Sequence, residues 1–199
     1  MAYLYRTPTT AGNRKTWTFS AWVKRSAVSG NQSLFTSRTD GSNYATIRLE
    51  SGKLHIFDIA TSFTYQVKTN RELRDCNGWY HIVVAFDTTQ STASNRIKMY
   101  VNGEQETSLA ENTYPSQNYD GFVNKADTHY LGQGGNLGDK FDGCMSHVHF
   151  VDGTALTPST FGSTDSSTTG EWKINTSPTV SSYGTNGFFI LKDGNSVTD

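Results

Sequence analysis

Long apolar runs are missing from this sequence. No stretch approaches the ~20 consecutive apolar residues of a membrane-spanning helix, so we expect no insertion into a membrane. Residues 1–6 also lack the apolar run of a secretory signal peptide. Any secretion signal is therefore expected elsewhere than at this end.

Cysteine is scarce. Only Cys76 and Cys144 are present, and their spacing is unlike that of a metal site. They could form one disulfide bond if their Cα atoms came within reach, or remain as buried thiols. We favour unbridged thiols, which leaves the redox compartment of the protein undecided.

A large excess of charge of either sign is missing too. The net charge is −1, so no overall field attracts nucleic acid or an anionic membrane, and we expect no nucleic-acid partner. Residues 1–39 hold six basic side chains and no acidic one, which leaves −7 for the remainder. This basic region could meet an acidic partner, but we favour solvated strand edges and loops.

What the chain does contain is typical of strands joined by tight turns. Aromatic residues make up 13% of it, together with 18 glycines. Residues 16–24 place Trp17, Phe19, Ala21 and Val23 at alternate positions, the pattern of a half-buried strand. Residues 79–87 (WYHIVVAFD) are almost continuously apolar, which predicts a central strand buried on both faces.

Turn signals recur between these segments. Residues 44–49 and 53–57 flank a glycine-bearing turn, and Asn102-Gly103 follows the alternating residues 96–101. The Asn-Gly dipeptide favours a type I′ turn, so we expect residues 105–109 to return antiparallel. Further strands are expected at residues 62–68, 129–133 and 145–151. The sequence therefore predicts an all-β fold, an antiparallel two-sheet β-sandwich of the jelly-roll kind.

The composition changes after Leu156. Of the 29 residues between Thr157 and Thr185, 15 are serine or threonine, too few apolar residues for a separate core. We therefore predict a sandwich over residues 1–158 and a Ser/Thr-rich segment over residues 159–199. Trp172 and the apolar residues 187–191 favour either docking of this segment on the sandwich or a link to a further module.

The order of the segments resembles that of laminin-G-like domains in the concanavalin A-like lectin superfamily. The resemblance covers residues 16–158 and implies a concanavalin A-like sandwich. It is carried by the segments TWTFSAWVK, YATIRLESGKLHIF, GWYHIVVAFD, NRIKMYVNGEQ, YLGQGG and FDGCMSHVHFVDGTALTP.

A narrower resemblance concerns the segments YLYRTPTTAGNRKTWTFSAWVKR, DTTQSTASNRIKMYVNG and FVDGTALTPSTFG. They look like laminin-G-like modules of virion structural proteins and tail fibres in marine bacteriophages. This implies an attachment module on the outside of a virion. Its implied partners are other virion proteins, copies of itself and host-surface glycans. The alternative is a secreted protein, with the chain as a carbohydrate-binding module of a bacterial enzyme or adhesin.

Catalysis is not expected. Glucanases of the same fold carry a Glu-x-Asp-x-x-Glu strand, and hydrolysis of glycosides needs such paired carboxylates. No Glu-x-Asp occurs in the chain, and the nearest acid pair, Asp139 and Asp142, lies in a glycine-rich loop. His147 and His149 share a predicted strand face, but a metal site needs further ligands, so we expect no metal there. The remaining rival is a divergent glycosidase that uses Asp139 or Asp142.

Calcium is the one cofactor left open, because many laminin-G-like domains bind it in loops. The candidate oxygens belong to Asp139 with Asp142, and to Asp40 with Asn43. Neither pair has the spacing of a known calcium loop. We favour turn-forming roles for them and therefore expect no cofactor.

Residues 112–124 (NTYPSQNYDGFVN) are the best ligand-binding segment in the sequence. Sugar sites combine an aromatic platform with amide and carboxylate hydrogen bonds, and this segment offers both. A neighbouring glycine-rich loop could complete the rim. The predicted ligand-binding residues are Tyr114, Asn118, Tyr119, Asp120 and Asn136.

Overall fold

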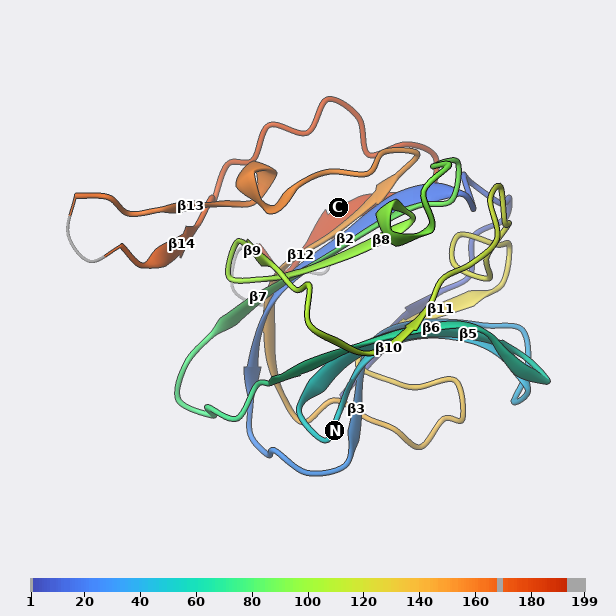
Figure 1. The fold of residues 1–199 in the computed structure, drawn as a ribbon, viewed down its shortest axis with the longest axis horizontal. Helices are drawn as coiled ribbons and strands as arrows, with labels where there is room; N and C mark the ends of the chain where they lie inside the picture. Colours follow the sequence, from blue (N-terminus) through green and yellow to red (C-terminus); the bar gives the residue numbers. More distant parts are fainter. Residues whose placement is uncertain (1, 168–169, 193–199) are drawn as a thin grey trace.

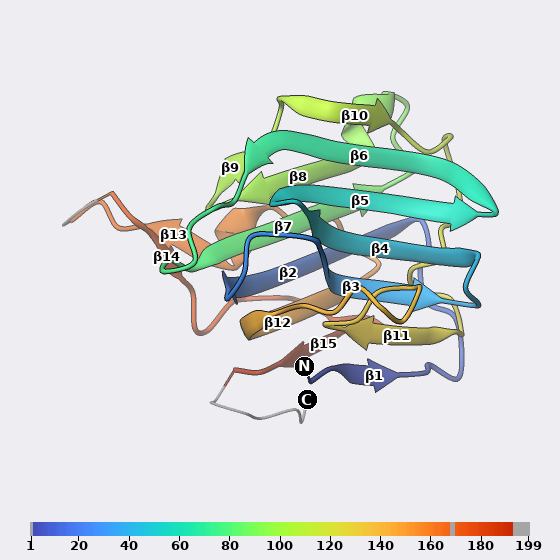
Figure 2. The same ribbon diagram turned by 90° about the horizontal axis from the view of Figure 1, so that it is seen from below.

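The chain folds into two antiparallel sheets packed face to face (Figures 1 and 2), which confirms the predicted all-β sandwich. The structure, a computed structural model, describes residues 2–167 and 170–192. Within this part of the chain, no helix is both long enough and apolar enough to cross a membrane. The only helices described there are two short 3-10 turns, η1 (Ala93–Asn95) and η2 (Pro158–Thr160).

The first sheet has seven strands, and its edges are β1 and β10. In spatial order they are β1 (Leu4–Arg6), β11 (Thr128–Leu131), β3 (Asn31–Arg38), β4 (Asn43–Glu50), β5 (Lys53–Ala60), β6 (Ser62–Glu72) and β10 (Leu109–Thr113).

The second sheet has six strands, and a separate two-stranded hairpin extends beyond it on the left of Figure 1. The sheet order is β15 (Phe188–Ile190), β12 (Gly143–Asp152), β2 (Thr16–Arg25), β7 (Tyr80–Asp87), β8 (Ile97–Val101) and β9 (Glu104–Gln105); the hairpin is β13 (Gly162–Thr164) with β14 (Trp172–Ile174).

The alternating apolar side chains of residues 16–24 form part of the core. Trp17, Phe19, Ala21 and Val23 on β2 are all fully buried, between the two sheets. They belong to one large apolar cluster to which strands of both sheets contribute. The predicted core face of this strand is therefore confirmed, but Thr18 and Ser20 on its other face are also fully buried, so the prediction that the strand is only half-buried is wrong.

Strand β7 is buried on both faces, as its apolar sequence predicts. Val84 and Phe86 belong to the core between the sheets. Val83 belongs to a smaller cluster that also contains Val151 and Phe161. That second cluster covers the outer face of the six-stranded sheet and is closed by the segment after β12.

The predicted return strand over residues 105–109 is wrong in its extent. Asn102 (φ +50°) and Gly103 (φ +84°) form the expected turn, but β9 ends at Gln105. The chain then crosses to the other sheet, where Leu109 begins β10 and pairs with β6. An ion pair between Glu106 and Arg71 on β6 lies at this crossing, with 2.9 Å between Nη1 and Oε1.

The segment after residue 158 runs along the outer face of the six-stranded sheet (Figure 1). Its last described strand, β15, pairs with β12 through Val148 and Ile190. A link to a further module was the alternative predicted for this same segment; it stays a prediction, and the last residues of the segment, 193–199, lie outside the described residues. Cys76 and Cys144 are free thiols, and Cys144 is exposed, in contrast to the buried thiol expected.

Candidate ligand-binding site

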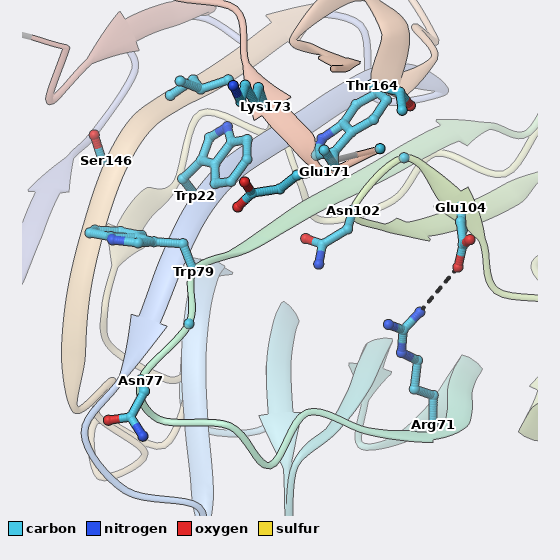
Figure 3. Close-up of a pocket in the computed structure, with 15 residues that line it drawn as sticks. Trp22, Arg71, Asn77, Trp79, Asn102, Glu104, Ser146, Thr164, Glu171 and Lys173 are labelled. Carbon is cyan, nitrogen blue, oxygen red and sulfur yellow. Dashed lines mark ion pairs between the residues drawn. The ribbon is translucent and has the colours of Figure 1, made fainter. Parts of the chain in front are cut away.

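A pocket of about 980 Å³ opens at one end of the outer face of the six-stranded sheet. Figure 3 shows the side chains around it. Strands β2 and β12 supply its floor, and the β13–β14 hairpin supplies one wall. The loop before β7 and the turn between β8 and β9 supply the remaining walls.

Three tryptophans line this pocket. Trp22 lies on β2 and is 9% exposed, whereas Trp79 lies just before β7 and is 41% exposed. Trp172 begins β14. Large aromatic side chains in a concave surface are typical of ligand sites, and the exposed face of Trp79 is available to one.

His81 connects two of the tryptophans. It pairs across the sheet with Trp22, whose ring stacks on the imidazole at a centroid distance of 5.0 Å. Trp172 donates its indole N–H to Nδ1 of His81 over 2.9 Å. Because Nδ1 accepts, the imidazole proton lies on Nε2, 2.9 Å from Oγ of Ser20.

Burial keeps this imidazole neutral. His81 is fully buried, and burial lowers its pKa to about 3, because desolvation disfavours the charged form. The neutral ring keeps Nδ1 as an acceptor near neutral pH. The position of Trp172 is thereby fixed by a hydrogen bond that does not titrate in that range.

Two glycines make room for Trp172. A Cβ atom on Gly103 would lie 2.5 Å from Cε3 of the indole, and a Cβ atom on Gly162 would lie 2.7 Å from Cε2. Gly103 also has a φ of +84°, which favours glycine. The Asn-Gly turn therefore shapes the pocket as well as reversing the chain.

Polar groups complete the pocket. Asn102 accepts a hydrogen bond from the backbone N–H of His81 over 2.8 Å, which leaves its NH₂ group beside the pocket (Figure 3). Within the part of the chain that the structure describes, the buried indole nitrogen of Trp22 has no hydrogen-bond partner. Arg71, Glu104, Glu171 and Lys173 provide charges around the rim.

The residues predicted from the sequence to bind a ligand lie elsewhere. Tyr114, Asn118, Tyr119 and Asp120 follow β10 in one loop, whereas Asn136 lies in the loop between β11 and β12. Tyr114 and Tyr119 pack partly against the core, and none of these residues lines the tryptophan pocket.

The polar groups of these loops already make contacts within their own loop or with neighbouring parts of the fold. The pKa of Tyr119 is raised to about 12, mainly by burial and then by Asp58. The side-chain oxygen of Asn136 accepts from the backbone N–H groups of Gly138 and Asp139, at 2.9 and 3.1 Å. The carbonyl of Asp120 accepts from Arg14 over 2.9 Å. Glycan binding by these residues stays a prediction.

The candidate calcium ligands serve other contacts. The NH₂ group of Asn43 donates to both carboxylate oxygens of Asp40, each at 2.9 Å, and Asp139 pairs with Arg48 at 3.3 Å. Calcium requires 6–8 oxygen ligands, and neither pair fits this demand. Among residues 2–167 and 170–192, no group of three or more His, Cys, Asp or Glu could hold a metal.

The two histidines of β12 make aromatic and hydrogen-bonded contacts. His149 is buried, stacks on Phe189 at 3.9 Å and lies 2.9 Å from the hydroxyl of Tyr183. His147 lies at an irregularity in the register of β12, with Nδ1 at 2.8 Å from the hydroxyl of Ser146.

The tryptophans of the pocket were not predicted as site residues. One signal was available for Trp22, because it occupies an outward position of β2, in line with Thr18, Ser20 and Lys24. A large aromatic residue on an otherwise polar strand face indicates a contact outside the sheet. Trp79 and Trp172 reach the same place only through the fold.

Comparison with solved structures finds the same fold in several other proteins. Domain 4 of AbnA, an extracellular arabinanase from Geobacillus stearothermophilus, is 18% identical with a TM-score of 0.57, over 74% of this chain and 65% of that one. A SAP-like pentraxin from Limulus polyphemus is 20% identical with a TM-score of 0.52, over 78% and 71%.

The mouse laminin alpha1 chain, domains LG4-5, is 14% identical with a TM-score of 0.54, over 96% of this chain and 44% of that one. This chain thus spans less than two thirds of the arabinanase domain and less than half of the laminin fragment. The comparison with curated proteins found no match.

Family assignment comes from the sequence match. The model of the concanavalin A-like lectin/glucanases superfamily, of the laminin G type, matches residues 3–161. This confirms the wider resemblance inferred from the order of the segments. The match ends before β13, so the hairpin that supplies Trp172 lies beyond it. The chain belongs to the concanavalin A-like lectin/glucanases superfamily.

Proposed function

We propose that this chain is a non-catalytic attachment module that binds glycans in the tryptophan pocket. The observation that carries the proposal is the gathering of Trp22, Trp79 and Trp172 around one open pocket. Sugar rings have apolar C–H faces that pack on aromatic rings, and their hydroxyl groups bond to amide and indole groups. The domain of the arabinanase is known in complex with arabinotriose, which supports the same use of this fold.

Binding without hydrolysis fits the carboxylates of the pocket. Glu104 and Glu171 both line it, but the side chain of Glu104 is 81% exposed and Glu171 is also exposed. Glycoside hydrolysis needs two carboxyl groups held at a controlled separation on the two sides of the bond that is cleaved. These two carboxylates lie in solvent, on a turn and beside the tip of a hairpin.

Glycan binding is tested with an oligosaccharide array and by calorimetry on the full chain. We expect dissociation constants in the micromolar to millimolar range and at least a tenfold loss in a Trp79→Ala variant. A Tyr114→Ala variant is the matched control, because it alters the loop predicted from the sequence. If Tyr114→Ala abolished binding and Trp79→Ala did not, the site would be the loop.

Hydrolysis is tested on the same sugars. We expect no reducing ends to accumulate when the chain is incubated with any oligosaccharide that it binds. Turnover that disappears in Glu104→Gln or Glu171→Gln variants would contradict a non-catalytic role. Turnover that disappears in Asp139→Ala or Asp142→Ala variants would instead support the divergent glycosidase.

The setting that we propose is the outer surface of a bacteriophage virion. Its support is the resemblance of the chain to laminin-G-like modules of virion structural proteins and tail fibres. Other virion proteins or further copies of the chain would then be its partners, and a host-surface glycan its receptor. Mass spectrometry of purified virus particles that carry the gene should detect its peptides. A gene set among secreted hydrolases would favour the carbohydrate-binding module instead.

We also propose that folding requires no calcium, since the donor sets of Asp40 with Asn43 and of Asp139 with Asp142 do not fit the ion. EDTA is expected to leave the melting temperature unchanged, and added calcium to leave it within a degree. A rise of several degrees with calcium, lost in Asp139→Asn, would show a site in the loop between β11 and β12.

A further inference from the structure

Strand β1 leaves one edge of the seven-stranded sheet open. It pairs with β11 alone, with Leu4 opposite Leu131 and Arg6 opposite His129. On the other side of β1, alternate backbone N–H and C=O groups point away from β11, and no further strand of the described chain pairs with them. An open edge of this kind can take an extended segment of another chain as an added strand.

The free edge of the other sheet lies beside β1 (Figure 2). Strand β15 is the last strand of the six-stranded sheet. Its residues Phe188 and Ile190 line the same pocket, of about 340 Å³, as Leu4 and Arg6 of β1. The pocket extends inward to the core residue Phe35, which is 2% exposed. The space between the two sheets is therefore open along this side of the sandwich and is lined mainly by apolar side chains.

A second pocket, of about 480 Å³, lies further along β1. It shares Leu4 with the first pocket but is lined by Ala2 instead of Arg6. Its other lining residues are mostly apolar and include Phe141, Met145 and Leu191. The two pockets succeed one another along the edge at about the interval of two residues, roughly 7 Å in a strand. Every second side chain of an added strand has the same spacing.

The opposite face of β1 carries exposed aromatic rings. Tyr5 is 70% exposed and Tyr3 is 43% exposed. The centroids of these two rings and of the Tyr130 ring are 6.1–6.4 Å apart. A strand added beside β1 would cover the ring of Tyr5, and aromatic rings pair favourably with β-branched side chains across a sheet. Both faces of β1 therefore offer contacts to an added strand.

Arg6 indicates one polar feature of the partner. It is the only charged side chain that lines the first pocket, because burial lowers the pKa of His129 to about 4 and keeps it neutral. Among the described residues, no carboxylate pairs with Arg6. A carboxylate on a docked segment would form this ion pair. The second pocket holds a carboxylate of its own, Asp142, so an acid is favoured only at the Arg6 end.

We propose that the edge formed by β1 binds an extended segment of a different protein by strand addition. The segment carries an acidic residue opposite Arg6 and apolar residues at the next two alternate positions, which enter the two pockets. The residues between them lie beside Tyr3 and Tyr5. Strand β1 of a second copy could not supply the acid, because residues 1–39 contain none. The inference goes beyond glycan binding and does not depend on it, since the edge and the tryptophan pocket share no lining residue.

The probes are two synthetic peptides with acetyl and amide ends, Ser-Glu-Thr-Val-Thr-Leu-Ser and its reverse, Ser-Leu-Thr-Val-Thr-Glu-Ser. They present the motif antiparallel and parallel to β1. We expect one of them to bind the full chain with a dissociation constant below about 1 mM, measured by fluorescence anisotropy of the labelled peptide. It should also shift the NMR signals of the backbone amides of residues 2–6. Ser-Glu-Val-Thr-Leu-Thr-Ser and its reverse place the acid and the apolar residues on opposite faces, and should bind about tenfold more weakly or not at all.

Charge reversal on both sides tests the contact of Arg6. Arg6→Glu should weaken binding of the peptide about tenfold or more. A peptide with Lys in place of Glu should bind Arg6→Glu as tightly as the original peptide binds wild type. Arg6 is exposed, so the variant should fold, which its circular dichroism spectrum checks. Lys98→Glu, on β8 of the other sheet, is the matched control and should leave binding of the peptide unchanged.

Two further changes test the backbone pairing and the aromatic face. N-methylation of alternate peptide residues removes the N–H groups on one side of the strand, so one of the two alternately methylated forms should lose binding and the other should keep it. Tyr5→Ser should weaken binding about two- to fivefold. Phe63→Ser is its control, because Phe63 is an aromatic residue of β6 in the same sheet and is 48% exposed.

The outcomes are distinct. Failure of both peptides to bind, with no shift of the amide signals of residues 2–6, would overturn the proposal, and Arg6 would then serve to keep the edge from self-association. Dimers of the chain in sedimentation experiments that dissociate in Tyr5→Ser would assign the edge to a second copy instead. Peptide binding that Arg6→Glu leaves unchanged would overturn the acidic motif. Trp79→Ala should bind the peptide as wild type does, so failure of glycan binding would leave this inference standing.

Discussion

Gly162 determines where the indole of Trp172 can lie. A Cβ atom there would lie 2.7 Å from Cε2 of the ring, so we expect Gly162→Ala to displace Trp172 and break its hydrogen bond to His81. Sugar affinity should fall at least tenfold. The melting temperature should fall by about 2–4 °C, as for the loss of one hydrogen bond in a domain of this size.

The measurement is calorimetry together with the indole N–H signal of Trp172 in NMR spectra. Gly41→Ala is the matched control, because the nearest atom to a Cβ atom at Gly41 lies 4.0 Å away, at the end of Arg38. Unchanged sugar binding in Gly162→Ala would show that Trp172 does not shape the site.

His129 should make stability depend on pH. Its pKa in the fold is about 4 instead of 6.5, chiefly through burial, with Asp127 and Arg6 acting in opposite senses. As the pH falls from 6.5 to 4, the unfolded chain takes up a proton that the folded chain does not. The free energy of unfolding therefore falls by about 1.4 kcal/mol per pH unit on account of this residue.

A His129→Gln variant removes this proton, and its side-chain oxygen can replace Nε2 as the acceptor. Nε2 of His129 accepts from the backbone N–H of Asn124 at 2.9 Å, and Nδ1 lies 2.8 Å from the carbonyl of Asp127. Urea unfolding at pH 7 and pH 5 should show wild type losing about 2 kcal/mol more than the variant. Equal losses would mean that His129 binds a proton as readily in the fold as in the unfolded chain.

Strand β12 holds the C-terminal segment through Asp152. The carboxylate of this residue accepts from the backbone N–H of Asn13 at 2.8 Å, the side chain of Asn124 at 2.6 Å and the backbone N–H of Asn186 at 3.1 Å. Asp152→Ala leaves buried donors without a partner, so we expect it to reduce the free energy of unfolding by about 3 kcal/mol.

Limited proteolysis should then cut residues 153–187 faster, as measured by mass spectrometry. Asp40→Ala is the control, because Asp40 accepts from Ser42 and twice from Asn43 in an exposed turn. Water can replace those contacts, and the effect should be much smaller. If both variants behaved alike, burial of the Asp152 network would not matter for holding the segment.

Strands could be predicted from the sequence where the local pattern of apolar and polar residues determines them. The alternation around Phe19 and the apolar run of β7 gave the right strands, and the core positions of Trp17 and Val84 followed. The return strand after the Asn-Gly turn was overextended. Strand β9 ends at Gln105 because the chain then crosses to the other sheet, where Leu109 pairs with β6. The local sequence gives no signal of this long-range contact.

For the whole molecule, the order of the segments in the sequence was enough to predict the family and the fold. The pocket could not be predicted in this way, because it forms where residues far apart in the sequence come together. Trp22, Trp79 and Trp172 lie on different segments, and Trp172 lies on a hairpin beyond the family match. The loop around Tyr119 was favoured because its aromatic and amide residues are neighbours in sequence. In the structure its tyrosines pack partly on the core, a role that composition alone cannot distinguish from ligand binding.

One shallow, open pocket should bind a single sugar weakly, so attachment would depend on several copies acting together. Biotin placed at the N-terminus allows four chains to be loaded on streptavidin, and a surface coated with a glycan that the monomer binds then presents many sites. The tetravalent form should bind about 10²–10⁴ times more tightly than the monomer in surface plasmon resonance. A tetravalent Trp79→Ala form controls for nonspecific adhesion. An unchanged affinity on tetramerisation would show that the pockets of one assembly cannot reach glycans at the same time, and would argue against a multivalent attachment role.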